Sequence, residues 1–185
     1  MKKVLSKIFL YFFWGILIGS ENNILTAQTN YPTPVKPASH LFYIQRTGNT
    51  NTIMYDAVLT SDAQIAIPQP IKPYWIRFAE NGDKKDLSFI QRKFAYGVEI
   101  KKLQTPNEFE FYIVSYSKIK MKLMLDKIGK PIALTHIDGK LSILNKVFIN
   151  MDPGTLLSFK PDIKYLELFG SNLQTGEPIY EKIIL

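Results

Sequence analysis

The chain has 185 residues, of which 46% are hydrophobic, and this is enough for one domain with a sizeable core. It contains no cysteine, which excludes disulfide bonds and a cysteine-dependent lipid anchor. The net charge of +7 is mildly basic, but the Lys and Arg residues form no recognisable nucleic-acid-binding module, so we predict no nucleic-acid partner. The charge favours only a weak attraction to anionic membrane surfaces.

Residues 1–27 have the features of a secretory signal peptide. Three lysines precede an uncharged apolar run at 8–19, and this run is shorter than the roughly 20 residues that span a membrane. We therefore predict cleavage after Ala27, export to the periplasm or the extracellular space, and no transmembrane segment in the mature chain. An uncleaved N-terminal anchor is the alternative interpretation. Removal of this segment leaves a net charge of +5.

The remainder of the chain divides into an arm and a domain. Residues 28–39 contain three prolines and predict an extended N-terminal arm. Residues 40–185 predict a single β domain, because short alternating runs are separated by turn residues. The predicted strands are 41–46, 52–59, 72–78, 98–103, 108–114, 118–125, 131–137, 140–147, 163–169 and 178–184.

One β-hairpin is predicted around a three-residue loop at 115–117. Side chains alternate cleanly on both sides of this loop, and the pairing places Phe111 opposite Met121 on the apolar face. The same register places Glu110 opposite Lys122 on the polar face. The row of lysines in the second strand is therefore explained as a solvated face.

A second hairpin is predicted at Asp138-Gly139, the strongest short turn signal in the chain. A two-residue turn here pairs Leu134 with Ile143. It also places His136 on the apolar side of the hairpin, where a partly buried structural histidine is the simplest interpretation.

The segment that begins at Pro73 is the most aromatic and cationic part of the predicted mature chain. Alternation predicts that Tyr74 and Ile76 face the core, while Trp75 and Arg77 occupy an amphipathic face.

Beyond a turn at Asn81-Gly82 the periodicity becomes helical, with Leu87, Ile90 and Phe94 on one stripe. We predict a helix near 86–95, capped by an aspartate, that lays this stripe on the sheet and ends at Gly97.

This segment supplies most of the candidate site. Trp75, Arg77, Gln91, Arg92 and Tyr96 would line a groove for an anionic or sugar-like ligand, because Arg offers paired donors and aromatic rings offer flat stacking surfaces. The alternative is that Trp75 only covers the helix and that the arginines are solvated.

The turn at 47–51 adds two amides. Asn49 and Asn51 would either bind a ligand or hydrogen-bond their own backbone to shape the turn.

Residues for familiar catalytic schemes are scarce. The chain has two histidines, His40 and His136, and no Gly-x-Ser-x-Gly motif that would supply a serine nucleophile. Neither histidine has a neighbouring residue at a spacing typical of a metal site. The chain also has no phosphate-binding loop and no dinucleotide fingerprint. We predict no catalytic residue, no metal site and no cofactor. A carboxylate pair drawn from Glu80, Glu99, Glu110 and Glu167 remains an alternative for glycoside chemistry.

Four segments carry a resemblance to a known family. They are FYIQRTGNTNTIMYDA at 42–57, PYWIRFAENG at 73–82, LSFIQRKFAYG at 87–97 and YLELFGSNLQTGEPIYEKI at 165–183. Together they resemble a family of exported bacterial proteins, common in Bacteroidota, called domain of unknown function 4833. The resemblance implies an envelope location and a stand-alone domain, and it implies no activity.

The resemblance also marks matching positions on this chain. These are Arg46, Asn49, Asn51, Tyr55, Trp75, Arg77, Gln91, Arg92, Lys93, Tyr96 and Gly97. We take all of them except Lys93 and Gly97 as candidate ligand-binding residues.

Taken together, the patterns predict a mainly β protein: an antiparallel β-meander barrel or a β-sandwich of about ten strands with one helix near 86–95. The expected function is a non-enzymatic binding or structural module with a site for a small anionic or carbohydrate ligand. The alternatives are an envelope glycan hydrolase that uses a carboxylate pair and a subunit of a secreted assembly.

Overall fold

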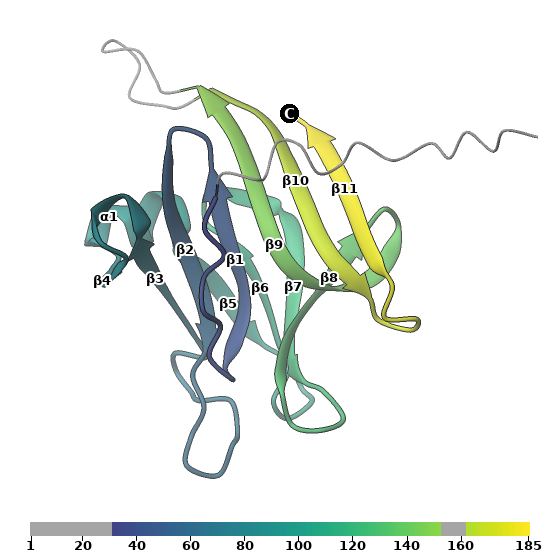
Figure 1. Cartoon of the computed structure of the whole chain (residues 1–185). Coiled ribbons are helices and arrows are strands. Elements are labelled where there is room, and N and C mark those ends of the chain that lie inside the picture. Colours follow the sequence, from purple (N-terminus) through teal and green to yellow (C-terminus); the bar gives the residue numbers. More distant parts are fainter. Residues whose placement is uncertain (1–30, 153–161) are drawn as a thin grey trace, which may run out of the picture. The chain divides into compact units, whose positions relative to one another are not determined.

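The computed structural model describes residues 31–152 and 162–185. The predicted signal peptide, 1–27, and the first residues of the predicted arm lie outside these ranges. In the described part, eleven strands form one continuous sheet that curls into a half-barrel (Figure 1). The prediction of a mainly β fold with one short helix is therefore confirmed.

The sheet contains the following strands. They are β1 (His40–Arg46), β2 (Asn49–Ala57), β3 (Ile71–Arg77), β4 (Asp83–Asp86), β5 (Val98–Lys102), β6 (Phe109–Ile113), β7 (Tyr116–Leu125), β8 (Pro131–Ile137), β9 (Lys140–Asp152), β10 (Asp162–Asn172) and β11 (Pro178–Ile184). A 3-10 turn at Phe78–Glu80 follows β3, and the helix α1 (Phe89–Gln91) continues into a π-helical turn at Arg92–Tyr96.

The long strand β9 organises the sheet. The order is β4-β3-β2-β1-β9-β8-β7-β6-β5, with β10 on the other edge of β9 and β11 beyond it. On one edge, β9 pairs with β8 at Lys140–Ile143 and then with β1 at Lys146–Ile149. The pair β1–β9 is parallel, whereas the other pairs are antiparallel. The sheet therefore forks at β9, between β8 and β1.

The hairpin around 115–117 has the predicted register. Phe111 pairs with Met121, and Glu110 pairs with Lys122. The Lys122 Nζ forms its ion pair with Glu108, at 2.7 Å, so the charge contact is diagonal and not directly across the strands.

The second hairpin also has the predicted register, with Leu134 opposite Ile143. The prediction for His136 is wrong, because its side chain is exposed. His136 shares its face with Leu141, its cross-strand partner, which is itself 44% exposed. Leu134 on the same face is 5% exposed, so this face is buried farther along β8 and open to solvent at the hairpin end, where His136 lies.

The main core lies between the two arms of the curled sheet. The Phe42 ring in β1 stacks on Tyr55 in β2 at 4.5 Å between centroids and lies 6.3 Å from Phe111 in β6. All three side chains are fully buried. These rings connect the β1–β2 arm with the β6–β7 arm, so the chain closes its curl over an apolar interior.

The predicted alternation in β3 is present, but the faces have different roles from those expected. Trp75 packs in the main core, whereas Tyr74 joins Tyr43 and Met54 in a small cluster on the outer face. The outer face is buried here because residues 31–38, which form no helix or strand, run along it. The Gln45 Nε2 donates to the Pro32 carbonyl at 2.8 Å and anchors this segment.

The short helix begins later than its apolar spacing indicated. Ser88 is the N-cap: its Oγ accepts from the Gln91 amide at 3.2 Å, and the Gln91 Oε1 accepts from the Ser88 amide at 2.9 Å. This capping box fixes the start of α1 two residues after Leu87, which is buried in the core. Ile90 and Phe94 are 68% and 64% exposed, so the prediction that their stripe packs on the sheet is wrong.

Candidate ligand-binding site

A cavity of about 530 Å³ opens where β1 ends, β2 begins and β3 ends, beside the start of α1. Six of the nine predicted site residues line it, although they come from three separate parts of the sequence. They are Arg46, Asn49, Asn51, Trp75, Arg77 and Gln91. Glu80, Lys85, Asp86 and Ser88 complete the lining.

Arg46 is the central cation of this cavity. Its guanidinium carbon lies 5.6 Å from the Trp75 ring centre and 5.9 Å from the Tyr96 ring centre, so the charge is held by cation–π contacts. The Nε atom is buried and has no hydrogen-bond partner among the described residues. Arg46 also forms no ion pair with any described acid. A half-buried guanidinium without a partner acid is a favourable binding group for an anion.

The three amide side chains leave their donors available. The Asn49 Oδ1 accepts from the Asn51 amide, and the Asn51 Oδ1 accepts from the Ala79 amide, both at 3.0 Å. The Gln91 Oε1 accepts from Trp75 Nε1 at 3.3 Å. The oxygens are thus used to build the site, whereas the amide NH₂ groups donate to no described residue. The cavity is rich in free donors and poor in free acceptors.

The acids that line the cavity are already engaged. Glu80 pairs with Arg77, which lies three residues before it, and the Asp86 Oδ1 lies 3.5 Å from the Lys72 Nζ. These pairs neutralise Arg77 and leave Arg46 and Lys85 as the lining cations that form no ion pair with a described acid. Of the four glutamates considered for glycoside chemistry, only Glu80 lines this cavity.

Two predicted residues support the floor of the cavity without lining it. Tyr96 packs edge-on against Trp75 at 5.3 Å between ring centroids. The fully buried Tyr55 donates its hydroxyl to the Tyr96 carbonyl at 2.9 Å. Burial raises the pKa of both phenols, and the charge of Arg46 partly opposes this rise for the pKa of Tyr96.

Arg92 is separated from the others. It is exposed and lines a neighbouring cavity of about 670 Å³ together with Lys72 and Gly97. The cause is the turn that follows α1, which places Gln91 against Trp75 and carries Arg92 beyond the cavity.

Sequence reasoning missed Lys85 and Ser88. Asn81 and Gly82 form the predicted turn with positive φ values of 66° and 78°, but this turn leads first into β4. There Lys85 pairs with Trp75 across the strands. The signal for Ser88 was available, because Ser-x-x-Gln is a capping-box pattern.

In the described ranges, no group of three or more histidines and acids is arranged to hold a metal ion. In the same ranges, no helix has the length and apolar character needed to cross a membrane.

A model of the family described as "Domain of unknown function (DUF4833)" matches residues 42–182. The chain belongs to this family. The matched range contains every residue that lines the Arg46 cavity, so the cavity lies inside the DUF4833 domain. Comparison with curated proteins and with solved structures gave no match.

Proposed function

We propose that this DUF4833 chain is a non-enzymatic binding module that holds a small acidic sugar or a related organic anion in the Arg46 cavity. The observation that carries the proposal is the Arg46 guanidinium, which lies within cation–π distance of the Trp75 and Tyr96 rings and has a buried Nε with no hydrogen-bond partner among the described residues. An anion in the cavity would pair with the accessible part of the guanidinium and compensate its charge.

The other residues of the cavity define the class of ligand. The NH₂ groups of Asn49, Asn51 and Gln91 suit the hydroxyl oxygens of a sugar, and the Arg46 guanidinium suits a carboxylate. The volume of about 530 Å³ is within the usual range for a small-molecule site. An acidic monosaccharide combines these properties.

The predicted signal peptide supports the proposal that this binding takes place outside the cytoplasm. A module that is exported to the periplasm or the cell surface would meet acidic sugars as components of envelope or extracellular glycans. This location is part of the proposal and is tested by following the protein into the exported fraction of its host.

Calorimetric titration with glucuronate and glucose tests the proposed function. These two sugars differ by one carboxylate, so glucuronate should bind and glucose should bind much more weakly. Arg46→Ala removes the charged donors, and we expect a tenfold to hundredfold loss of affinity, on the order of 1.5–3 kcal/mol.

The matched control is Arg92→Ala, which removes the same charge from the neighbouring cavity. Affinity for glucuronate should be unchanged in this variant. Equal losses in the two variants would indicate a general charge effect and would contradict a specific site at Arg46.

A further inference from the structure

A second cavity, of about 270 Å³, lies at the fork of the sheet. The β8 pairing of β9 ends at Ile143 and the β1 pairing begins at Lys146, so Leu144 and Asn145 pair with neither strand on this edge. As β1 and β8 diverge, they leave a wedge that is lined from both strands, from β9 and from the segment before β1. The cavity therefore exists because β1 and β8 pair with successive parts of the same edge of β9.

This cavity lies at the other end of β1 from the Arg46 cavity. His40 begins β1, and Arg46 ends it. His40 stacks with Tyr43, which belongs to the outer cluster, whereas Arg46 packs against Trp75 in the main core. The two cavities share no lining residue. A ligand in one can therefore be distinguished experimentally from a ligand in the other.

His40 is held in one orientation by a buried chain of hydrogen bonds. Its Nδ1 lies 3.0 Å from the Asp56 Oδ1, and the Tyr74 hydroxyl donates to the Asp56 Oδ2 at 2.7 Å. A carboxylate only accepts, so the Nδ1 carries a proton, and in the neutral imidazole the Nε2 lone pair is the remaining acceptor.

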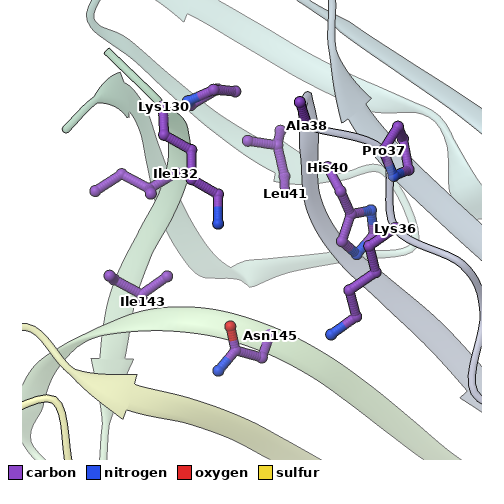
Figure 2. A pocket seen from close by; sticks show the side chains of 10 residues that line it. Lys36, Pro37, Ala38, His40, Leu41, Lys130, Ile132, Ile143 and Asn145 are labelled. Atoms are coloured by element: carbon purple, nitrogen blue, oxygen red, sulfur yellow. The ribbon is translucent and has the colours of Figure 1, made fainter. Parts of the chain in front are cut away.

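The His40 Nε2 is a buried polar atom without a partner. The His40 side chain is 6% exposed, and this nitrogen accepts no hydrogen bond from a described residue. Buried acceptors of this kind are uncommon in folded proteins. Figure 2 shows the His40 ring at the cavity with the Lys36 side chain running beside it. Lys36 is exposed, and its Nζ lies 5.2 Å from the Tyr43 ring centre.

The remaining polar groups give the cavity a mixed character. Lys36 and Lys130 extend their ammonium groups into it from two sides (Figure 2), and none of its lining residues is acidic. The Asn145 Nδ2 donates to the Ser171 Oγ at 3.0 Å, so its oxygen is the atom left for a ligand. The cavity thus offers two cations together with two acceptors.

We propose that this cavity is a second ligand site, built for a small hydroxy acid. The carboxylate of the ligand pairs with Lys36 and Lys130, and its hydroxyl donates to the His40 Nε2 or to the Asn145 oxygen. Leu41, Ile132 and other apolar side chains on the walls contact the short carbon chain of the ligand. The volume limits the ligand to a few carbon atoms.

Imidazole NMR signals of the full-length protein provide the test. The chain has two histidines, and the exposed His136 serves as an internal reference for His40. The probes are lactate, propionate, which lacks the hydroxyl, and lactamide, which lacks the charge. We expect lactate to shift the His40 signals and leave those of His136 unchanged. Propionate and lactamide should each bind about threefold to tenfold more weakly.

Variants separate this site from the Arg46 cavity. Lys36→Ala with Lys130→Ala should weaken lactate binding by about tenfold or more, because both side chains are exposed and contribute charge. The control pair, Lys101→Ala with Lys102→Ala, removes two exposed lysines elsewhere and should bind lactate normally. Arg46→Ala should also bind lactate normally.

Three results would overturn the proposal. The first is that no probe shifts the His40 signals more than those of His136. The second is that the Lys36 and Lys130 double variant binds lactate like the unmodified chain. The third is that propionate binds as tightly as lactate, which would remove the role assigned to the His40 Nε2.

Discussion

At the scale of single residues, Arg46 is a cation without a matching acid. Aromatic rings and amide groups surround its guanidinium, and the carboxylates of the cavity are paired with other cations. Such an arrangement costs free energy in the unliganded protein, because a half-buried charge is incompletely solvated. Function that is built at the expense of stability is typical of binding sites.

This reasoning predicts the effect of Arg46→Met on stability. The substitution removes the unpartnered charge and keeps an apolar chain beside the Trp75 and Tyr96 rings. We expect the free energy of unfolding in urea to be unchanged or raised by up to about 1 kcal/mol, even though glucuronate binding is lost. A decrease of more than about 1 kcal/mol would instead assign Arg46 a structural role.

Lys146 is a second residue whose surroundings affect stability, here through its pKa. Its Nζ lies near the rings of Tyr43, Phe148 and Phe169, at 5.4–6.0 Å from their centres. Burial lowers the pKa of Lys146 from 10.5 to about 8, and the charge of Glu167 partly opposes this shift.

The lowered pKa predicts a rise of stability with pH. Between pH 8 and 10.5 the unfolded chain retains a proton on Lys146 that the folded chain has released, so proton loss favours folding. We expect Lys146 to contribute on the order of 1 kcal/mol of added stability between pH 8 and 10, because solvent screening reduces the effect of the shift. Denaturant unfolding at the two pH values should show this rise in the unmodified chain, and Lys146→Met should lack it.

The rise of stability with pH is expected to end near pH 10, where the tyrosines of the unfolded chain begin to ionise. Burial raises the pKa of Tyr43, Tyr55 and Tyr96, so above pH 10 the unfolded chain releases tyrosine protons that the folded chain keeps. Stability then falls with further increase in pH. Equal pH dependence in Lys146→Met and the unmodified chain between pH 8 and 10 would contradict the assignment.

Sequence reasoning brought together six residues of the cavity but could not identify its centre. Arg77 was a leading candidate because its charge was visible, and its pairing with Glu80 depends on the 3-10 turn that follows β3. The isolation of Arg46 depends on Trp75 and Tyr96, which reach it through the fold. The sequence identifies both arginines, but only the structure shows that Arg77 is paired with an acid and that Arg46 is not paired with any described acid.

At the scale of elements, the sequence predicted the register of the two hairpins correctly but predicted the buried face of the helical segment wrongly. Alternation fixed the register of β6 with β7 because one face of each strand is buried, and a slip would expose that face. The helical spacing of Leu87, Ile90 and Phe94 was not constrained in this way by a buried face. The capping box at Ser88 starts the helix after Leu87 and turns the other two side chains toward solvent.

This difference predicts contrasting effects of two phenylalanine substitutions. Phe111→Ala should cost about 3–5 kcal/mol in the free energy of unfolding, because the side chain is fully buried against Phe42. Phe94→Ala should change it by no more than about 0.5 kcal/mol, because Phe94 is 64% exposed. Similar losses in the two variants would contradict the exposure of the helical segment.

At the scale of the whole molecule, the parallel pairing of β1 with β9 joins distant parts of the DUF4833 domain. It brings Tyr43 beside Lys146, and short-range hairpin signals cannot predict it because about one hundred residues intervene. The fork that it creates also forms the His40 cavity. The sequence therefore predicted ten of the eleven described strands and the two hairpin turns, whereas β4, the fork and its cavity required the structure.

The central position of β9 predicts a pattern of amide hydrogen exchange. Amides of β1 and β9 should exchange through global unfolding, because both strands have partners on both edges. Amides of β4 and β11 should exchange faster, since within the described ranges each of these strands pairs with a single neighbour. Faster exchange in β1 than in β11 would contradict the pairing described for these strands.

The Arg46 cavity is tested most directly by the fluorescence of Trp75. The chain has two tryptophans, Trp14 and Trp75, so Trp14→Phe leaves the cavity residue as the reporter. Titration of this full-length variant with glucuronate should change the emission in a saturable way, and adding Arg46→Ala should abolish the change. Binding of glucuronate without any change in Trp75 emission, or with the same change after Arg46→Ala, would contradict the proposed site.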